Sequence, residues 1–90
     1  MSIEHAKLER VLKALSNKRR LAILKFIRRE KEASVGDIAQ AIRLSLKSTS
    51  RHLIVLFSAD IVDKEQRSSE MYYKIVTPIS STVSHILSLL

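Results

Sequence analysis

The apolar residues of the 90-residue chain recur with two different periods, and the change falls near residue 60. Before it they recur every three or four positions, as on one face of a helix, in the segments 3–15, 18–29, 34–42 and 46–59. Residues 61–65 and 71–76 are rich instead in the β-branched and aromatic residues that favour strands. Helical spacing returns from residue 77 to residue 90. We therefore predict a mainly α fold with a small β-hairpin, in the order α-α-α-α-β-β-α.

Polar residues mark the points where the predicted helices begin. Asn17 is a favoured N-cap for the helix over 18–29, and Ser45 is one for the helix over 46–59. Ser34 and Asp37 form a capping box in which Asp takes the place of the usual Glu. Thr77-Pro78 offers an N-cap followed by proline at the first helical position, which predicts that the last helix begins there.

The third and fourth predicted helices are joined by the short segment 43–45 and form a helix-turn-helix candidate, although the usual turn glycine is missing. On the fourth helix Thr49, Leu53, Leu56 and Phe57 fall on one face, which we expect to point inward. The polar stretch 66–69 suits the tip of the hairpin that follows. A helix-turn-helix followed by a β-hairpin describes a winged helix.

The charge of the chain is concentrated in its first half. Residues 1–51 hold 13 of the basic and 5 of the acidic side chains, and residues 52–90 hold 3 basic and 4 acidic ones, within a formal net charge of +7. A positive field of this kind attracts polyanions such as nucleic acid. The chain is also 46% hydrophobic with one Gly and one Pro. We expect one ordered domain over 1–90 whose small core is completed by a second copy.

Several classes of function are disfavoured by the composition. Without cysteine there are no disulfides, thiolate metal sites or cysteine nucleophiles. A single glycine leaves no phosphate-binding loop, and the His and acidic residues show no catalytic spacing, so we do not expect an enzyme. The N-terminus lacks the apolar region of a signal peptide, and no apolar run approaches the length of a membrane span. We therefore expect a cytoplasmic protein that does not enter the membrane.

Five stretches between Ala14 and Val76 occur together in a recognisable order and spacing: ALSNKRRLAIL, SVGDIAQAI, LSLKSTSRHLIVL, ADIVDKEQ and MYYKIV. In this combination the chain resembles the arsenical-resistance repressor (ArsR-like) family of winged-helix transcription regulators. The resemblance implies a homodimer that binds double-stranded operator DNA. For this chain we expect no cofactor. The resemblance also implies that the fourth helix enters the major groove, that the wing lies on the backbone or in the minor groove, and that the first and last helices build the dimer interface.

The resemblance and the outward-facing positions together give a set of candidate site residues. For the recognition helix they are Lys47, Ser48, Ser50, Arg51 and His52, with Arg51 the strongest candidate for a base contact and His52 undecided between a contact within the domain and a phosphate contact. For the wing they are Lys64, Gln66, Arg67 and Ser68. Candidates for further contacts to DNA phosphates are Arg19, Arg20 and Ser45. For the dimer interface they are Leu8, Val11, Leu12, Val83, Ile86, Leu87 and Leu90.

Two departures from the family concern metal binding. Family members that sense metals often have a Cys-x-Cys motif at the start of the third helix, where this chain has the segment 33–37 without a thiol. Others use Asp and His residues along the last helix, where this chain offers only His85. We therefore expect no metal effector. A metal or pH-sensitive site shared by His5 and His85 across a dimer is the alternative.

Two other functions remain compatible with the sequence. One is an architectural protein that coats DNA with little sequence preference, although the nearly neutral wing is less suited to it. The other is a protein-interaction module that uses the winged helix as a scaffold. The sequence does not distinguish a repressor from an activator.

Overall fold

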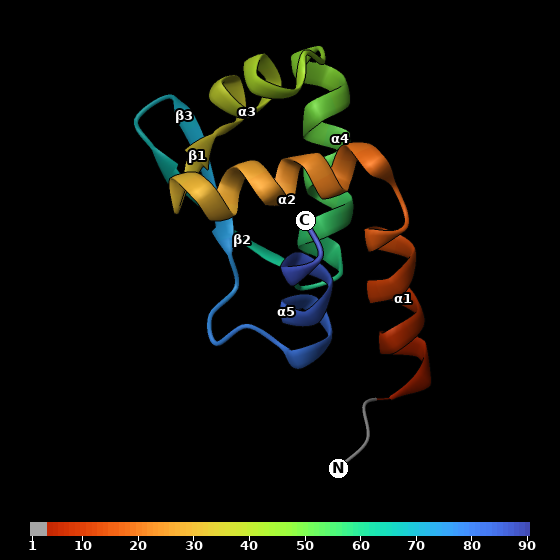
Figure 1. Ribbon diagram of the computed structural model, residues 1–90. Coiled ribbons are helices and arrows are strands. Elements are labelled where there is room, and N and C mark those ends of the chain that lie inside the picture. The colour runs from red at the N-terminus through yellow and green to blue at the C-terminus, as the bar shows by residue number, and fades with distance from the viewer. Residues whose placement is uncertain (1–3) are drawn as a thin grey trace.

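The predicted winged helix is confirmed by the computed structural model, which describes residues 4–90 (Figure 1). The predicted start of the first helix at Ile3 lies outside the described residues. The helices are α1 (His5–Leu15), α2 (Lys18–Glu30), α3 (Val35–Ile42), α4 (Leu46–Ser58) and α5 (Ser81–Ser88). The strands are β1 (Ala33–Ser34), β2 (Val62–Arg67) and β3 (Glu70–Ile75). Within the described part of the chain, no helix has the length and apolar character needed to cross a membrane.

Most helices begin where the sequence places their caps. Asn17, Ser34 and Ser45 each accept a backbone N–H of the helix that follows, at 2.9–3.1 Å. The prediction for the last helix was wrong, because α5 begins at Ser81 and its cap is Ser80, which accepts the backbone N–H of Val83 at 3.2 Å. The segment that contains Thr77 and Pro78 connects β3 to this helix instead.

The turn between α3 and α4 forms without glycine. Arg43 adopts the left-handed conformation there, with φ 58° and ψ 48°, and its backbone N–H bonds to carbonyls of the last turn of α3. For a residue with a side chain this conformation costs about 1–2 kcal/mol. The packing of α3 and α4 against the rest of the domain offsets that cost, so the absent glycine does not weaken the helix-turn-helix assignment.

The hairpin is longer than predicted and belongs to a larger sheet. The three strands are antiparallel in the order β1-β3-β2, and the two-residue β1 pairs with Tyr72 and Tyr73. Such a short strand has no period that a sequence pattern can reveal. Arg67 pairs with Glu70 across the hairpin, which leaves a two-residue turn at its end. Gln66 and Arg67, which we predicted to lie in the tip, are therefore the last residues of β2.

The core is built around α2, which contacts α1, α3, α4, α5 and β3. Its Ile23, Leu24 and Ile27 are fully buried, together with Leu53 and Leu56 of α4. The prediction that Phe57 points inward was wrong: the side chain is 38% exposed, and its ring lies 4.5 Å from the Lys64 ammonium. The neighbouring Leu56 takes the inward position, and Phe57 lies farther round the helix.

The start of α4 and the tip of the hairpin lie far from the outer ends of α1 and α5. Figure 1 shows the start of α4 and the tip of the hairpin at one end, on the same side as α3. The helices α1 and α5 reach towards the opposite end, with α5 packed on α2. A ligand that met both α4 and the hairpin would therefore leave much of α1 and α5 free for another contact.

Candidate nucleic-acid interface

The first two turns of α4 present polar side chains to solvent on an anchored helix. Thr49 and Leu53 are fully buried, as predicted, and they fix the helix to the core. Lys47 and Arg51 are exposed, and Ser48 and Ser50 are half-buried between them. The positive end of the helix dipole lies at this terminus, and it favours anions.

Lys47 and Arg51 carry the charge of this surface. Neither side chain forms a salt bridge or a hydrogen bond with any group in residues 4–90. They lie four residues apart, and this spacing puts them on the same helix face. Leu46 is also well exposed here, at 60%. The start of α4 thus combines two unpaired cations, hydroxyl groups and one apolar side chain, a mixture suited to phosphates and base edges.

His52 points the other way and belongs to a network inside the domain. Its Nδ1 lies 3.2 Å from Nη1 of Arg20. The same guanidinium donates through Nε to the carbonyl of Ala14 at 2.6 Å and through Nη2 to the carbonyl of Lys13 at 3.3 Å. Since Arg20 can only donate, Nδ1 must accept and His52 must be neutral. This arrangement supports the interpretation of His52 as a residue bonded within the domain, and it links the end of α1 to α4.

The surroundings of His52 lower its pKa. Partial burial disfavours the imidazolium, and the positive charges of Arg20 and Arg19 act in the same direction. The pKa in the folded chain is then below the unfolded value of about 6.5. As pH falls, the unfolded chain takes up this proton first. The contribution to stability is therefore present above about pH 6.5 and is lost as pH falls through that value towards the lowered pKa of the folded state.

A variant that cannot take up this proton tests the network. We expect His52→Gln to reduce the acid sensitivity of folding, because the Gln amide oxygen accepts from Arg20 at every pH. The loss of melting temperature between about pH 8 and about pH 5 measures this sensitivity. The difference in that loss between wild type and variant is the contribution of His52. Equal losses of melting temperature in both proteins would contradict the proposed role of the network.

The two arginines predicted to contact phosphate differ in their availability. The Arg20 guanidinium is engaged with Ala14, Lys13 and His52, so it is not the free cation that we expected. Arg19 is exposed and forms no side-chain bond with the described residues. The partial burial of Arg20 follows from its place over the end of α1, where its Nε bonds to the carbonyl of Ala14 in the last turn of the helix. Arg19 therefore remains the candidate for phosphate.

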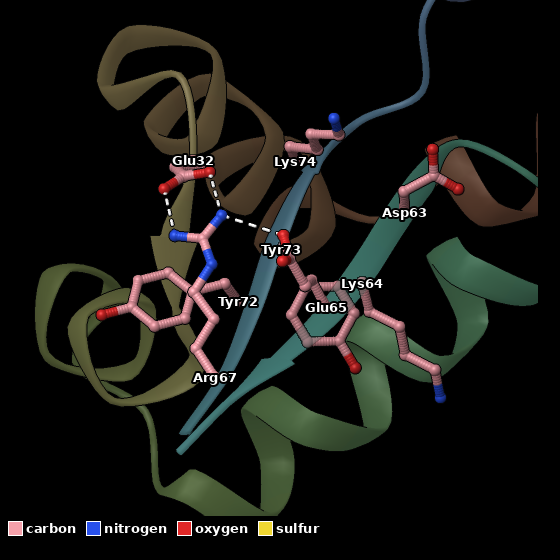
Figure 2. Close-up of a pocket in the computed structure, with 8 residues that line it drawn as sticks. All are labelled: Glu32, Asp63, Lys64, Glu65, Arg67, Tyr72, Tyr73 and Lys74. Atoms are coloured by element: carbon pink, nitrogen blue, oxygen red, sulfur yellow. Dashed lines mark hydrogen bonds and ion pairs between the residues drawn. The ribbon is translucent and has the colours of Figure 1, made fainter. Parts of the chain in front are cut away.

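The wing residues have more internal contacts than their polar character indicated. The Lys64 ammonium lies over the Phe57 ring, and the Gln66 amide donates to the carbonyl of Ser68 at 2.9 Å. Ser68 occupies the turn with φ 55° and is exposed. A shallow groove of about 300 Å³ lies beside these strands and is lined by acidic and basic side chains in similar number. Figure 2 shows these side chains. The charge of the wing is thus largely balanced within the wing.

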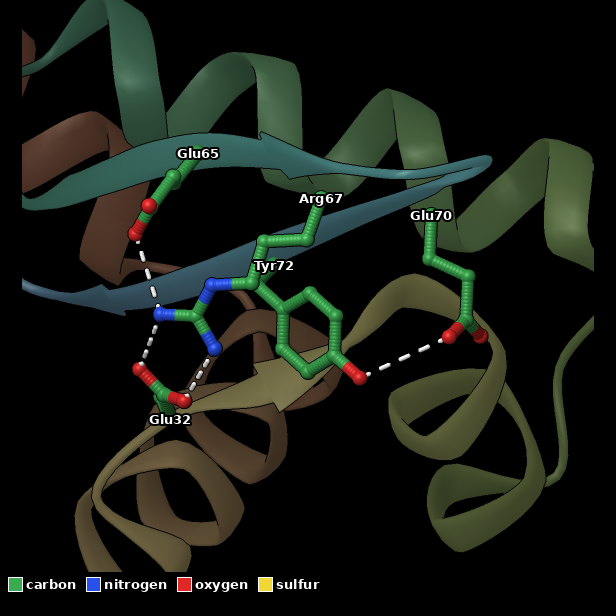
Figure 3. Close-up of polar contacts among 5 residues, drawn as sticks. All are labelled: Glu32, Glu65, Arg67, Glu70 and Tyr72. Atoms are coloured by element: carbon green, nitrogen blue, oxygen red, sulfur yellow. Dashed lines mark hydrogen bonds and ion pairs between the residues drawn. The ribbon is translucent and has the colours of Figure 1, made fainter.

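Arg67 is the most heavily bonded of the predicted wing residues. Its Nη1 and Nη2 both donate to the carboxylate of Glu32, and Nη2 also donates to Glu65 at 2.9 Å (Figure 3). Its guanidinium carbon lies 4.6 Å from the centre of the Tyr72 ring. Sequence reasoning counted Glu65 in the charge of the wing but did not identify Glu32 or Glu65 as a partner of Arg67. Glu32 is 35 residues away from Arg67, and no local pattern relates the two positions.

The residues predicted for the dimer interface divide into two groups. Val11, Val83 and Leu87 are buried in the core of the single chain, so they already pack against their own domain. The others keep exposed surface: Leu8 and Ile86 are half-buried, and Leu12 and Leu90 are exposed. Leu89, which sequence reasoning missed, is 70% exposed. An apolar surface therefore remains on α1 and at the end of α5.

No group of three or more metal-ligating side chains occurs among residues 4–90. The two positions at which metals bind in the resembled family offer no suitable donor set, because the start of α3 has no thiol and α5 has His85 alone. These residues do not fit a metal site of either kind.

Comparison with known proteins places these features in a family. The family described as "Bacterial regulatory protein, arsR family" matches residues 17–64, which is more than half of the chain. No curated protein sequence matches the chain. The matched segment runs from the cap of α2 through the helix-turn-helix and into β2.

Solved structures extend the similarity to nearly the whole chain. Reduced HlyU from Vibrio cholerae is 32% identical, with a TM-score of 0.79 over 94% of this chain and 85% of that one. A homodimeric winged helix-turn-helix DNA-binding domain from Mycobacterium bovis is also 32% identical, with a TM-score of 0.79 over 93% of this chain and 74% of that one. The transcriptional repressor PagR of Bacillus anthracis is 27% identical, with a TM-score of 0.76 over 96% and 98% of the two chains.

Proposed function

Because the chain belongs to the arsR family of bacterial regulatory proteins, which are DNA-binding transcription regulators and not enzymes, we propose that it binds operator DNA as a homodimer. In this proposal α4 enters the major groove and the hairpin lies over the backbone or the minor groove. The observation that carries it is the pair Lys47 and Arg51, two exposed cations without a bonding partner among residues 4–90, on the second helix of a helix-turn-helix. Since the proposed partner is double-stranded DNA, we expect the protein to work in the cytoplasm.

Contacts at the start of α4 divide into two kinds. Lys47 and Arg51 have the donors that pair with guanine O6 and N7, and Leu46 offers an apolar contact for a thymine methyl. Ser45, Ser48 and Ser50 bring hydroxyls to the positive end of the helix dipole, where they suit phosphate oxygens. Phosphate contacts supply affinity that falls with salt, and the base contacts supply sequence discrimination.

Dimerisation is supported by the surface left over on α1 and after α5. Leu12 is 47% exposed, and Leu8 lies beside it on one side of α1 in a shallow apolar depression. The chain ends in Leu89 and Leu90, both exposed. We propose that the domain spans 1–90 and that its first and last helices pair with those of a second copy. Two copies related by a two-fold axis would read half-sites about one helical turn apart, roughly 10 base pairs.

We also propose that DNA binding is not controlled by a metal, because the donor sets at the start of α3 and on α5 do not fit one. Zinc titrated into the dimeric protein should leave both the melting temperature and the DNA affinity unchanged. A rise in melting temperature that is lost in His5→Ala or His85→Ala would instead favour a site shared between two copies.

Selection of bound sequences from a random pool of double-stranded DNA tests the proposed function. We expect enrichment of an inverted repeat with half-sites about one helical turn, roughly 10 base pairs, apart. Binding without enrichment would favour an architectural protein that coats DNA. Absence of binding even at low salt would favour a protein-interaction module and contradict the proposal.

A further inference from the structure

A bidentate ion pair connects the hairpin to the helix-turn-helix. Glu32 lies between α2 and β1, and β1 runs directly into α3, the first helix of the helix-turn-helix. Arg67 is the last residue of β2, at the outer end of the hairpin. Figure 3 shows the two side chains meeting in a planar fork across the sheet, the arrangement that gives such pairs their directional specificity.

The guanidinium of Arg67 has two further partners, although its side chain is 41% exposed. Glu65 accepts a bond from it on one side, and the ring of Tyr72 lies 4.6 Å from its carbon on the other. The hydrogen bonds from Arg67 hold the pKa of Glu32 below its usual range. Arg67 has a pKa raised chiefly by its bond to Glu32 and then by its bond to Glu65. The charge of Arg67 is thus matched by two carboxylates at the edge of the wing.

The ion pair ties the outer half of the hairpin to the rest of the domain, alongside the packing of Met71 on the core. The third strand, β1, pairs only with Tyr72 and Tyr73, so Gln66 and Met71 have no neighbouring strand beyond each other. Among the side-chain hydrogen bonds of residues 4–90, those from Arg67 to Glu32 are the ones that join the hairpin to another part of the chain. A two-stranded ribbon is flexible in isolation. An ion pair near the outer end of the hairpin therefore limits the angle between the hairpin and the helices.

We propose that Glu32 is a positioning residue for DNA binding: through Arg67 it holds the hairpin at the angle at which its tip meets the DNA. In this proposal Arg67 stabilises the position of the wing and does not bind phosphate. This inference rests on the proposed function, since it requires that the hairpin contacts DNA. It assigns a role to an acidic residue in a protein whose ligand is a polyanion.

The alternative role of Arg67 predicts the opposite effect of removing Glu32. If Arg67 were a phosphate ligand, Glu32 would compete with the DNA for it. Loss of that carboxylate would release the cation, remove a repulsive charge and strengthen binding. If Glu32 positions the wing, its loss weakens binding although the protein becomes more positive. The sign of the change therefore separates the two roles.

Glu32→Gln is the variant to measure, with Glu30→Gln as its matched control. Each removes one negative charge at or just after the end of α2, but among residues 4–90 Glu30 is paired only with its neighbour Arg29. We expect Glu32→Gln to weaken operator binding about one-and-a-half- to fivefold, the range that an exposed ion pair supports. Glu30→Gln should bind equally well or slightly more tightly. An affinity for Glu32→Gln equal to or above that of wild type would overturn the proposal.

Two further measurements exclude a general structural effect. The slope of log affinity against log salt should be unchanged in Glu32→Gln, since the tip residues Gln66, Ser68 and Ser69 are uncharged. Loss of a cationic DNA ligand would instead lower the slope by about one. The exchanged pair Glu32→Arg with Arg67→Glu should restore most of the affinity that Arg67→Glu alone removes. Failure of this exchange in a protein with a normal melting temperature would also contradict the positioning role.

Gln66→Glu distinguishes this proposal from the one on which it rests. It places a negative charge near the turn of the hairpin and should weaken binding if the hairpin contacts DNA. Weakening by Gln66→Glu without an effect of Glu32→Gln would refute the positioning role and leave the wing contact intact. No effect of either variant would refute both.

Discussion

Arg51→Ala will weaken binding to the selected operator by about tenfold to a hundredfold, while binding to scrambled DNA falls only a few fold. A bidentate contact between arginine and guanine contributes about 1–3 kcal/mol of discrimination against other bases. Arg51 is exposed on the outward face of α4, opposite the buried Leu53, and forms no salt bridge with any described residue. Electrophoretic shifts with the two DNAs at one salt concentration measure the difference. Equal losses on both would contradict a base-reading role.

Arg19→Ala is the matched control for this experiment. Arg19 is also exposed, and it lies at the start of α2, away from the recognition helix in the sequence. A phosphate contact carries no sequence information, so its loss should weaken operator and scrambled DNA by the same factor and lower the salt slope by about one. A larger effect of Arg19→Ala on the operator alone would show that the assignment of roles between the two arginines is wrong.

Local chemistry explains why so much of the fold was predictable. The caps at Asn17, Ser34 and Ser45 depend on a side chain and a backbone N–H only two or three residues apart, so the sequence contains the whole interaction. The apolar periods similarly place Thr49 and Leu53 inward. The sequence predicts the cap of the last helix at Thr77, and the structure has it at Ser80, because another capping residue follows within three positions.

The candidate site was less predictable because it depends on distant pairs. A basic residue in a basic chain was interpreted as a free cation, but Arg20 satisfies the end of α1 and Arg67 is bonded to Glu32. The partners of Arg20 and Arg67 are brought close by tertiary packing, so the local sequence pattern does not reveal them. The same holds for β1, whose two residues form a strand only because Tyr72 and Tyr73 lie beside them. The charges that remain free are fewer than the composition indicates.

Leu12→Glu will convert the protein to a monomer and reduce operator binding by at least about a hundredfold. The side chain is half exposed in the single chain, so a glutamate there does not disturb the core formed by Val11, Ala14 and Leu15. In a dimer the same position would bury a carboxylate without a partner, which costs several kcal/mol. Sedimentation measures the association. When one copy of a dimer is bound to its half-site, binding of the second copy is effectively intramolecular, which raises the operator affinity. The monomer loses this increase in affinity.

Ala6→Glu separates loss of the interface from a general effect of charge on α1. Ala6 is exposed and lies about 120° round the helix from Leu12, on the face away from the core. The new carboxylate is equally acidic but should remain in solvent, so dimerisation and operator binding should be preserved apart from a small electrostatic loss. If Leu12→Glu remained a dimer with normal operator affinity, the second copy would have to pair through another surface. The unburied leucines of α1 would then be ordinary exposed side chains, because single apolar residues are common on protein surfaces.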